Sequence, residues 1–278
     1  MKKQSIMAHC LVRNEERWIW YAINSVLDFV DKILVYDTGS TDNTVKIINS
    51  IKSPKIIFTE KGEVDAYGMV KLRQEMLEKT GTDWFMILDG DEVWTNDTIA
   101  EVFKEMNAAE KGKDTIVVPQ WWCLGDVYHF SPNTEKFIHP KVPPGLIGWR
   151  SVRVIKTGIE GLHCLGVYPN EGYYDKRGIR ISDRPGNHLI FTKNKCFHMS
   201  LLPRSSTRLK DREVIKRTRK THFIKGIPFP GNISYPEVFY KKKPKIVASC
   251  WKRFTLVDQL KGYYFRSLNF VERRLGEY

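Results

Sequence analysis

Short apolar strands alternate with amphipathic helices along the first 120 or so residues of this 278-residue chain. The runs "SIMAHCLV" (5–12), "KILVY" (32–36) and "KIIFT" (55–59) are short, rich in β-branched residues and bounded by polar breakers, which predicts three strands. "WFMIL" (84–88) and "TIVVP" (115–119) predict two more. Repeated strand–helix alternation is typical of an α/β fold, in which helices cover a mainly parallel sheet through right-handed connections.

The helices between these strands are predicted from apolar residues spaced three and four positions apart. After residue 120 the pattern weakens into loops rich in aromatic residues, proline and glycine, in which "WRSVRVI" and "KCFHMSLL" predict strands. The expected helices lie at 15–29, 44–51, 68–79 and from Asp97 or Thr98 to about 110.

Three polar loops follow the predicted strands: "RNEER" after the first, "DTGSTDNT" after the second and "DGDE" after the fourth. In open α/β sheets, ligands bind in the crevice outside the carboxyl ends of the strands. We therefore expect these loops to converge on one cleft.

The second loop combines a turn with a candidate ligand contact. Gly39 permits a tight turn close to a ligand. Asp42 or Asn43 can cap the following helix, which leaves Asp37 without a structural role. The carboxylate of Asp37 can accept a hydrogen bond from the imide N–H of a uracil or thymine base. The alternative is that Asp37 only caps the turn.

The third loop places Asp89, Asp91 and Glu92 within four positions. Like charges this close repel and lose hydration, so they need a positive partner. Hard oxygen ligands on alternating residues can face one Mg²⁺ or Mn²⁺ that bridges to phosphate oxygens, and Gly90 between them allows a ligand to approach closely. The alternative is that the acids only favour the start of a helix.

The ordered set "LVRNEE", "VYDTGSTDNT", Arg73 and "WFMILDGDE" resembles the family-2 glycosyltransferases of the GT-A fold, over about residues 5–120. The resemblance implies a Rossmann-like sandwich, a nucleotide-sugar donor such as a UDP- or dTDP-sugar, a metal-bridged diphosphate and inversion at the anomeric carbon. It also implies that Asp37 holds the base and that Arg73 reaches the nucleotide or its phosphates. Asp89 and Asp91 then lie on the ribose and the metal, and His198 in "CFHMS" completes the metal site. The other implied donor contacts are Val12, Asn14, Glu16, Ser40 and Gly90.

The general base is the least defined part of the site. Related enzymes use a carboxylate, often after a late strand and sometimes in a His-Glu pair. Here His163 is followed by Cys164 in place of glutamate. Glu171, in a stretch rich in proline and glycine, is the first candidate, Glu160 the second and Asp175 the third.

The net charge of +13 lies entirely in the last part of the chain. Residues 1–199 contain 26 Lys/Arg and 26 Asp/Glu, whereas residues 200–278 contain 19 and 6. This asymmetry predicts a catalytic domain at 1–200, divided into a nucleotide-sugar half (1–120) and an acceptor half (121–200). A basic extension at 201–278 would face an anionic acceptor, a membrane surface or nucleic acid; the alternative is a merely solvated tail.

A basic amphipathic helix is predicted from about residue 252. Such a helix can lie on an anionic membrane surface or dock on its own domain. Its apolar positions are Val257, Leu260, Tyr264, Leu268, Val271 and Leu275.

The expected function is that of a metal-dependent inverting glycosyltransferase, cytoplasmic and at the inner face of the membrane, with a lipid-linked or lipopolysaccharide-type acceptor. A signal-like apolar segment is absent from the N-terminus, and the five scattered cysteines are expected to be reduced and buried. One alternative acceptor is a hydroxymethylated base in viral DNA. A metal-dependent nuclease or phosphotransferase is the alternative from another class, but it leaves "DTGSTDNT" without a use.

Overall fold

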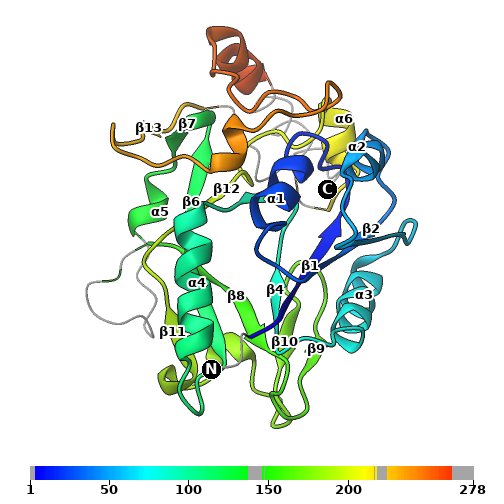
Figure 1. Ribbon diagram of the computed structural model, residues 1–278. Helices are drawn as coiled ribbons and strands as arrows, with labels where there is room; N and C mark the ends of the chain where they lie inside the picture. Colours follow the sequence, from blue (N-terminus) through cyan, green and yellow to red (C-terminus); the bar gives the residue numbers. More distant parts are fainter. Residues whose placement is uncertain (1–3, 137–145, 147, 216, 218–223, 265–278) are drawn as a thin grey trace, which may run out of the picture.

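The structure is a computed structural model, which describes residues 4–136, 146, 148–215, 217 and 224–264 (Figure 1). Its centre is a mixed sheet in the order β13-β7-β6-β8-β4-β1-β2-β3. Neighbouring strands among β4, β1, β2 and β3 pair in parallel, whereas β8 is antiparallel to both β4 and β6. The main strands are β1 (Ile6–Val12), β2 (Lys32–Asp37), β3 (Ile56–Glu60), β4 (Trp84–Ile87), β6 (Thr115–Leu124) and β8 (Arg150–Lys156).

The remaining elements complete an α/β fold of the predicted class. The helices are α1 (Ile19–Val26), α2 (Thr44–Ser50), α3 (Ala66–Glu78), α4 (Asn96–Ala108), α5 (Asn133–Lys136) and α6 (Arg208–Arg212), with short 3₁₀ turns η1 (Ile181–Asp183), η2 (Gly186–His188) and η3 (Glu237–Tyr240). The shorter strands are β5 (Glu92–Val93), β7 (Asp126–Phe130), β9 (His163–Leu165), β10 (Gly172–Tyr174), β11 (Leu189–Phe191), β12 (Cys196–His198) and β13 (Ile227–Pro228).

The predicted strands and helices of the first 120 residues are present, with shifted ends. The predicted strand 115–119 is the first half of the longer β6. The predicted cap of α4, Asp97 or Thr98, is wrong because Thr95 takes that role: its hydroxyl accepts from the backbone N–H of Thr98 at 3.1 Å. Asp97 lies instead in the first turn, where its charge suits the helix dipole.

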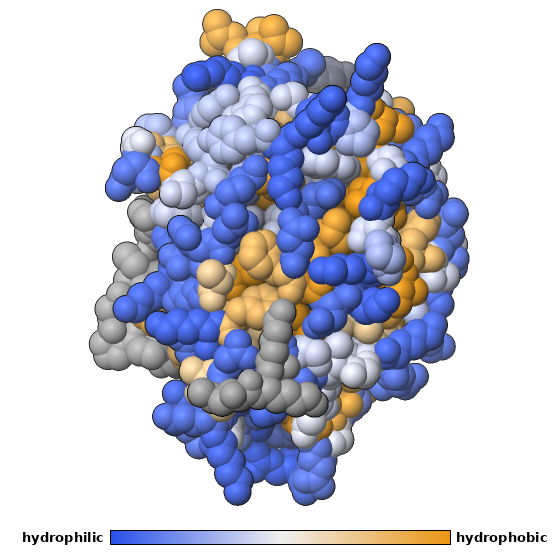
Figure 2. Space-filling model, in the orientation of Figure 1, coloured by the Kyte–Doolittle hydropathy of each residue, from blue (hydrophilic) through white to orange (hydrophobic). Residues whose placement is uncertain are grey.

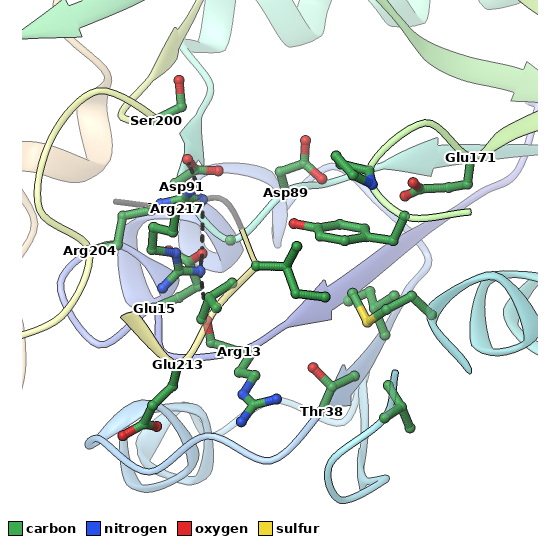
Figure 3. A pocket seen from close by; sticks show the side chains of 18 of the residues that line it. Arg13, Glu15, Thr38, Asp89, Asp91, Glu171, Ser200, Arg204, Glu213 and Arg217 are labelled. Carbon is green, nitrogen blue, oxygen red and sulfur yellow. Dashed lines mark hydrogen bonds and ion pairs between the residues drawn. The ribbon is translucent and has the colours of Figure 1, made fainter. Parts of the chain in front are cut away.

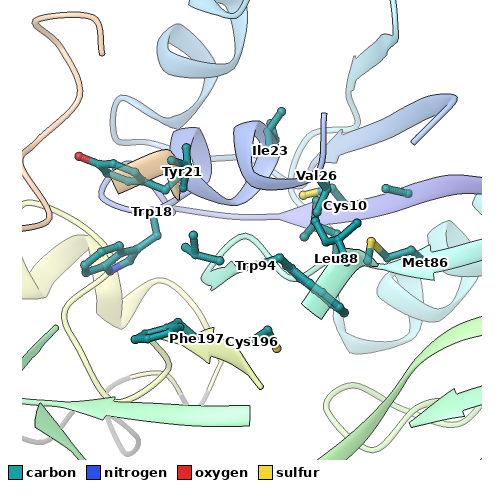
Figure 4. Close-up of a cluster of buried hydrophobic side chains, with 14 of the residues drawn as sticks. Cys10, Trp18, Tyr21, Ile23, Val26, Met86, Leu88, Trp94, Cys196 and Phe197 are labelled. Carbon is teal, nitrogen blue, oxygen red and sulfur yellow. The ribbon is translucent and has the colours of Figure 1, made fainter. Parts of the chain in front are cut away.

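The main hydrophobic core joins both halves of the chain (Figure 4). Cys10 and Leu88 come from the nucleotide-half strands and loops, and Phe197 comes from β12. Trp94, which is 1% exposed, fills the space between them. All five cysteines are buried and free, as predicted.

The chain after residue 200 also packs into this core. Val238, Phe239, Val247 and Cys250 are buried members of the main cluster, and the hydroxyl of Tyr21 on α1 donates to the carbonyl of Ala248 at 2.8 Å. Residues beyond the predicted boundary at residue 200 therefore contribute to the same core as the residues before it. Within the described residues, no helix combines the length and hydrophobicity needed to cross a bilayer.

Candidate functional site

A cavity of about 210 Å³ opens at the carboxyl ends of β1, β2 and β4 (Figure 3). The three predicted loops contribute to it, as expected from the sheet topology. Residues from far along the chain close its other side. The lining consists of Leu11, Arg13, Glu15, Thr38, Val64, Met69, Arg73, Asp89, Gly90, Asp91, Tyr168, Pro169, Glu171, His198, Ser200, Arg204, Glu213, Val214, Ile215 and Arg217.

The first loop presents the opposite set of side chains from the one predicted. Leu11, Arg13 and Glu15 line the cavity, whereas Val12, Asn14 and Glu16 are buried in the protein. β1 ends at Val12, and Asn14 leaves the extended conformation at φ 54°, so the alternation of side chains along the strand does not decide which residues of the loop face the cavity. The predicted donor-contact residues Val12, Asn14 and Glu16 are not part of the cavity lining.

Asn14 organises this loop instead. It adopts the left-handed conformation at φ 54°, which asparagine tolerates better than most residues. Its side-chain oxygen accepts from the backbone N–H of Thr41 at 2.7 Å, and its amide donates to the carbonyl of Lys210 at 2.8 Å. Ser40, another predicted donor contact, accepts at its hydroxyl from the backbone N–H of Asn14 at 2.8 Å.

Asp37 has the structural role that the sequence analysis gave as the alternative. Its Oδ1 accepts from the backbone N–H groups of Gly39 and Ser40 at 3.0 and 2.9 Å. The other oxygen, Oδ2, is buried and has no hydrogen-bond partner among the described residues. One oxygen thus holds the turn. Asp37 itself is 2% exposed and is not part of the cavity lining. The neighbouring Thr38, which lines the cavity, was not predicted.

Buried arginines pair with the three acids after β4. Arg153 on β8 lies 3.1 Å from Oδ2 of Asp89 and also donates to Glu92. The Nη1 of Arg204 lies 2.8 Å from Oδ2 of Asp91. The positive partners that these acids require are therefore guanidinium groups contributed by β8 and by the chain after β12.

The same acids can also hold a divalent cation. Ligand atoms of Asp89, Glu92 and His198 lie within 4.8 Å of one another, and Nε2 of His198 lies 3.4 Å from Oδ2 of Asp91. Carboxylate oxygens with one imidazole suit Mn²⁺ or Mg²⁺. Asp89 and His198 of the predicted set belong to this group, and its third member is Glu92, which β5–β12 pairing places directly opposite His198. Asp91, the other predicted ligand, is not a member of the group. A bound cation would have to displace the arginines from these carboxylates.

Burial and charge set the protonation of these groups. Burial raises the pKa of Glu92 to about 7 despite Arg153 beside it. Burial also raises the pKa of Glu15 to about 7, although Arg204 and Arg217 oppose the shift. At Asp91 the effect of burial is outweighed by Arg204 and His198, which hold the pKa of its carboxyl far below its usual range.

His198 responds to the same carboxylates in the opposite sense. Burial lowers the pKa of an imidazole, but Asp91 outweighs this effect and raises the pKa of His198 above its ordinary value. In the absence of a cation, a protonated His198 therefore helps to balance Asp91.

The candidate bases lie in different surroundings. Glu171 lines the cavity, where its Oε1 accepts from Nε of Arg73 at 2.9 Å. Its Oε2 is buried without a hydrogen-bond partner among the described residues. The side chain of Glu160 is 75% exposed, pairs with Lys176 at 2.7 Å and is not part of the cavity lining. Asp175 is also outside the lining, because its carboxylate holds the turn through the N–H groups of Arg177 and Ile179.

The segment from Pro203 to Ile215, together with Arg217, closes the cavity and is termed the clamp segment. Arg217 donates to the carbonyl of Arg13 at 2.7 Å and pairs with Glu15 at 2.5 Å. Glu213 accepts from the amide of Asn14 at 3.0 Å. The sequence analysis assigned no residue of this segment to the site. Its only signal was a dense run of arginines and lysines, which gives no information about a partner 200 residues away.

The fold and the site define a class of protein. A mainly parallel sheet whose second- and fourth-strand loops meet at one cavity, with an acidic cluster after the fourth strand, is a GT-A-type architecture. The sequence matches the family described as "Glycosyl transferase family 2" over residues 11–161, more than half of the chain. The chain belongs to this family.

Individual relatives match shorter stretches. An uncharacterized glycosyltransferase of Rickettsia felis is 33% identical over 89 residues, which are 32% of this chain and 29% of the relative. The glycosyltransferase SunS of Bacillus phage SPbeta is 29% identical over 107 residues, 38% of this chain and 24% of SunS. The matched stretches thus span less than a third of either relative.

Among solved structures, S. aureus TarS 1–349 in complex with UDP-GlcNAc has a similar fold. The TM-score is 0.50 at 14% sequence identity, and the match covers 78% of this chain and 69% of the TarS chain. At this identity the similarity concerns the fold alone.

Proposed function

We propose that this protein transfers a sugar, with inversion, from a nucleotide-sugar donor to a hydroxyl group of an acceptor, and that a divalent cation assists the transfer. The observation that carries the proposal is the single cavity in which the loop after β2, the acids after β4 and His198 meet. Family membership supports the same class of reaction.

The donor is assigned to the side of the cavity formed by β1 and β2. Asp37 would accept from a base N–H through its Oδ2, which is buried without a partner among the described residues and lies outside the cavity lining in this structure. Thr38 and Arg13, which line the cavity, would lie beside the nucleoside. Arg73 and Arg204 would face the diphosphate, because guanidinium groups match phosphate geometry. TarS is described in complex with UDP-GlcNAc, so uridine nucleotides are the first donors to test.

Asp89, Asp91, Glu92 and His198 would hold the cation, either Mn²⁺ or Mg²⁺. When bound, it would supply positive charge to stabilise the departing nucleoside diphosphate. Arg153 bridges Asp89 and Glu92 in this structure, and the cation would take its place between these two carboxylates.

Glu171 is assigned as the general base, since it combines a place in the cavity with an oxygen that has no other partner among the described residues. Its bond from Arg73 fixes the carboxylate in one orientation. A base must lie within hydrogen-bond reach of the proton it removes, and this requirement disfavours the exposed Glu160.

The proposed acceptor is a lipid-linked or lipopolysaccharide-type glycan at the cytoplasmic face of a membrane. The concentration of positive charge after residue 200 supports an anionic acceptor or surface. A hydroxymethylated base in DNA is the alternative that the same charge allows.

The test is a screen of nucleotide sugars for thermal stabilisation and for hydrolysis, with Mn²⁺ and with EDTA. Stabilisation by one class of nucleotide sugar, together with cation-dependent hydrolysis, is the expected result. If no nucleotide sugar binds while plasmid DNA is cleaved in the presence of Mg²⁺, the protein is a nuclease and the proposal is wrong.

A further inference from the structure

The last described part of the chain exposes apolar side chains on a helix that stands out from the body. Residues 256–264 are helical and form the segment that projects at the top of Figure 1. Leu256 is 79% exposed and Leu260 67%, and Val257, Tyr263 and Tyr264 are each more than half exposed. Figure 2 shows this tip as an apolar group of atoms above a hydrophilic surface. The predicted stripe continues to Leu268, Val271 and Leu275, which lie outside the described residues.

Positive charge accompanies these apolar side chains. Residues 241–264 contain seven lysines and arginines and a single acid, Asp258. Lys252, Arg253 and Lys261 are exposed on or beside the helix. Asp258 lies 3.8 Å from Lys252 and bonds to Thr255 at the start of the helix, so one acid offsets little of the charge.

A second, smaller cavity of about 70 Å³ lies at the root of this helix. Arg17, Lys252 and Arg253 contribute cations to it. One of its two acids, Asp126, accepts a hydrogen bond from the backbone N–H of Phe254 at 2.8 Å and also bonds to Nδ1 of His129. The cavity therefore presents positive charge directly below the exposed leucines.

We propose that this part of the molecule docks on an anionic lipid bilayer. The docking surface consists of Lys252, Arg253, Leu256, Val257, Leu260, Lys261, Tyr263 and Tyr264. The leucines and the valine enter the boundary between headgroups and acyl chains, and the tyrosines lie at headgroup level. The lysines and arginines contact lipid phosphates, with those around the second cavity holding one headgroup.

The combination of cationic and apolar side chains on this surface favours a bilayer over other partners. In a symmetric pair of chains, the same lysines and arginines would face each other and repel. Against nucleic acid, the cations would find phosphates but the aliphatic side chains would gain no burial. An anionic bilayer is the partner that satisfies both kinds of side chain.

The docking surface is connected to the catalytic cavity. Leu202 and Pro203 line the second cavity, and the next residue, Arg204, lines the first. The helix therefore holds the clamp segment, and with it the mouth of the catalytic cavity, close to the membrane. This inference deepens the proposed function, on which it rests for the nature of the acceptor, whereas binding to vesicles requires neither donor nor acceptor.

The test is co-sedimentation of the full chain with vesicles of phosphatidylcholine alone and of phosphatidylcholine mixed with phosphatidylglycerol. Binding should require the anionic lipid and should weaken as salt rises, because the Debye length falls from ~10 Å at 0.1 M to ~3 Å at 1 M. The double variant Leu256→Gln/Leu260→Gln should bind on the order of tenfold or more weakly, since two large apolar side chains are lost. The matched control is Leu165→Gln, which replaces an exposed leucine on β9.

Charge is tested by a second pair of variants. Lys252→Ser/Lys261→Ser should weaken binding on the order of tenfold or more, whereas Lys104→Ser/Lys111→Ser removes the same net charge from another surface and should leave binding unchanged. Folding of each variant is checked by its melting temperature, and donor hydrolysis should be unaffected in all of them.

Three results would overturn the proposal. The first is that every variant binds anionic vesicles as well as the wild-type chain does. The second is concentration-dependent dimerisation of the wild-type chain that the leucine variant abolishes. The third is that the wild-type chain binds duplex DNA and not vesicles, and that the Lys252/Lys261 variant loses the DNA binding. If the wild-type chain hydrolyses no nucleotide sugar, that result would instead count against the proposed reaction and leave the vesicle result standing.

Discussion

The guanidinium of Arg204 lies 2.8 Å from the carboxylate of Asp91, although 112 positions of sequence separate the two residues. Arg204 also lies 3.1 Å from Glu15 and so bridges the first and third loops of the site. A cation that binds Asp91 must compete with this arginine. Release of Arg204 would make it available to the donor diphosphate, which links cation binding to donor binding.

Asp91→Asn tests the role of this carboxylate. The substitution keeps the shape of the side chain but removes the charge that Arg204 and His198 face. Donor hydrolysis should fall by at least roughly 10²-fold. Because a buried ion pair is broken, unfolding should become easier by ~3–5 kcal/mol. Asp97→Asn, in the exposed first turn of α4, is the matched control and should change neither quantity.

The affinity for Mn²⁺ should rise between pH 6 and pH 8. The pKa of Glu92 is raised to about 7, so its carboxyl holds a proton at pH 6 that the cation must displace and is ionised at pH 8. His198, whose pKa is also raised, acts in the same direction. Calorimetry at the two pH values measures the change, and Glu92→Gln should bind more weakly and with a flatter pH dependence. An affinity independent of pH would exclude Glu92 as a ligand.

Glu171→Gln should lower turnover by ~10²–10⁴-fold and leave donor binding intact, because the acceptor hydroxyl would keep its proton. Glu160→Gln is the control, since Glu160 pairs with Lys176 outside the cavity. Steady-state kinetics with acceptor and donor titration by calorimetry separate the two effects. The reverse outcome, an active Glu171 variant and an inactive Glu160 variant, would transfer the role to Glu160.

Gly90→Ala should disturb the site without changing any charge. A Cβ at position 90 would come within 2.9 Å of Val12 Cγ1 and Glu15 Cγ. The glycine therefore permits close packing of two loops, which differs from the predicted approach of a ligand. We expect a loss of ~1–3 kcal/mol in the free energy of unfolding and weaker donor binding as Glu15 moves. Gly81→Ala, which has no atom within 4 Å of the added carbon, is the control.

Local patterns in the sequence were sufficient for the strands and for the meeting of the loops. β1, β2 and β4 are apolar runs that end in polar loops, and parallel pairing brings those ends together. The strand pattern could not fix which side chains of the first loop face the cavity, because that depends on the register at Asn14 and on its left-handed conformation.

Partners that are distant in sequence could not be predicted from local patterns. Arg153 interrupts an apolar strand, which is a signal of a buried role, but nothing near it in sequence identifies Asp89 and Glu92 as its partners. The carboxylate of Asp37 illustrates the converse. Both roles considered for it were possible from sequence, and its two oxygens differ: one holds a turn, and the other is buried without a partner among the described residues.

The bonds of Asn14 to Lys210 and Glu213 have a consequence for how the protein is made. A ribosome synthesises the first loop early, but the residues that hold it arrive about 200 positions later. Contacts this distant in sequence form late and slowly. A nascent or prematurely terminated chain that lacks the clamp segment would therefore carry the acids after β4 without a finished donor cavity, so catalytic competence appears only after the clamp segment has been synthesised.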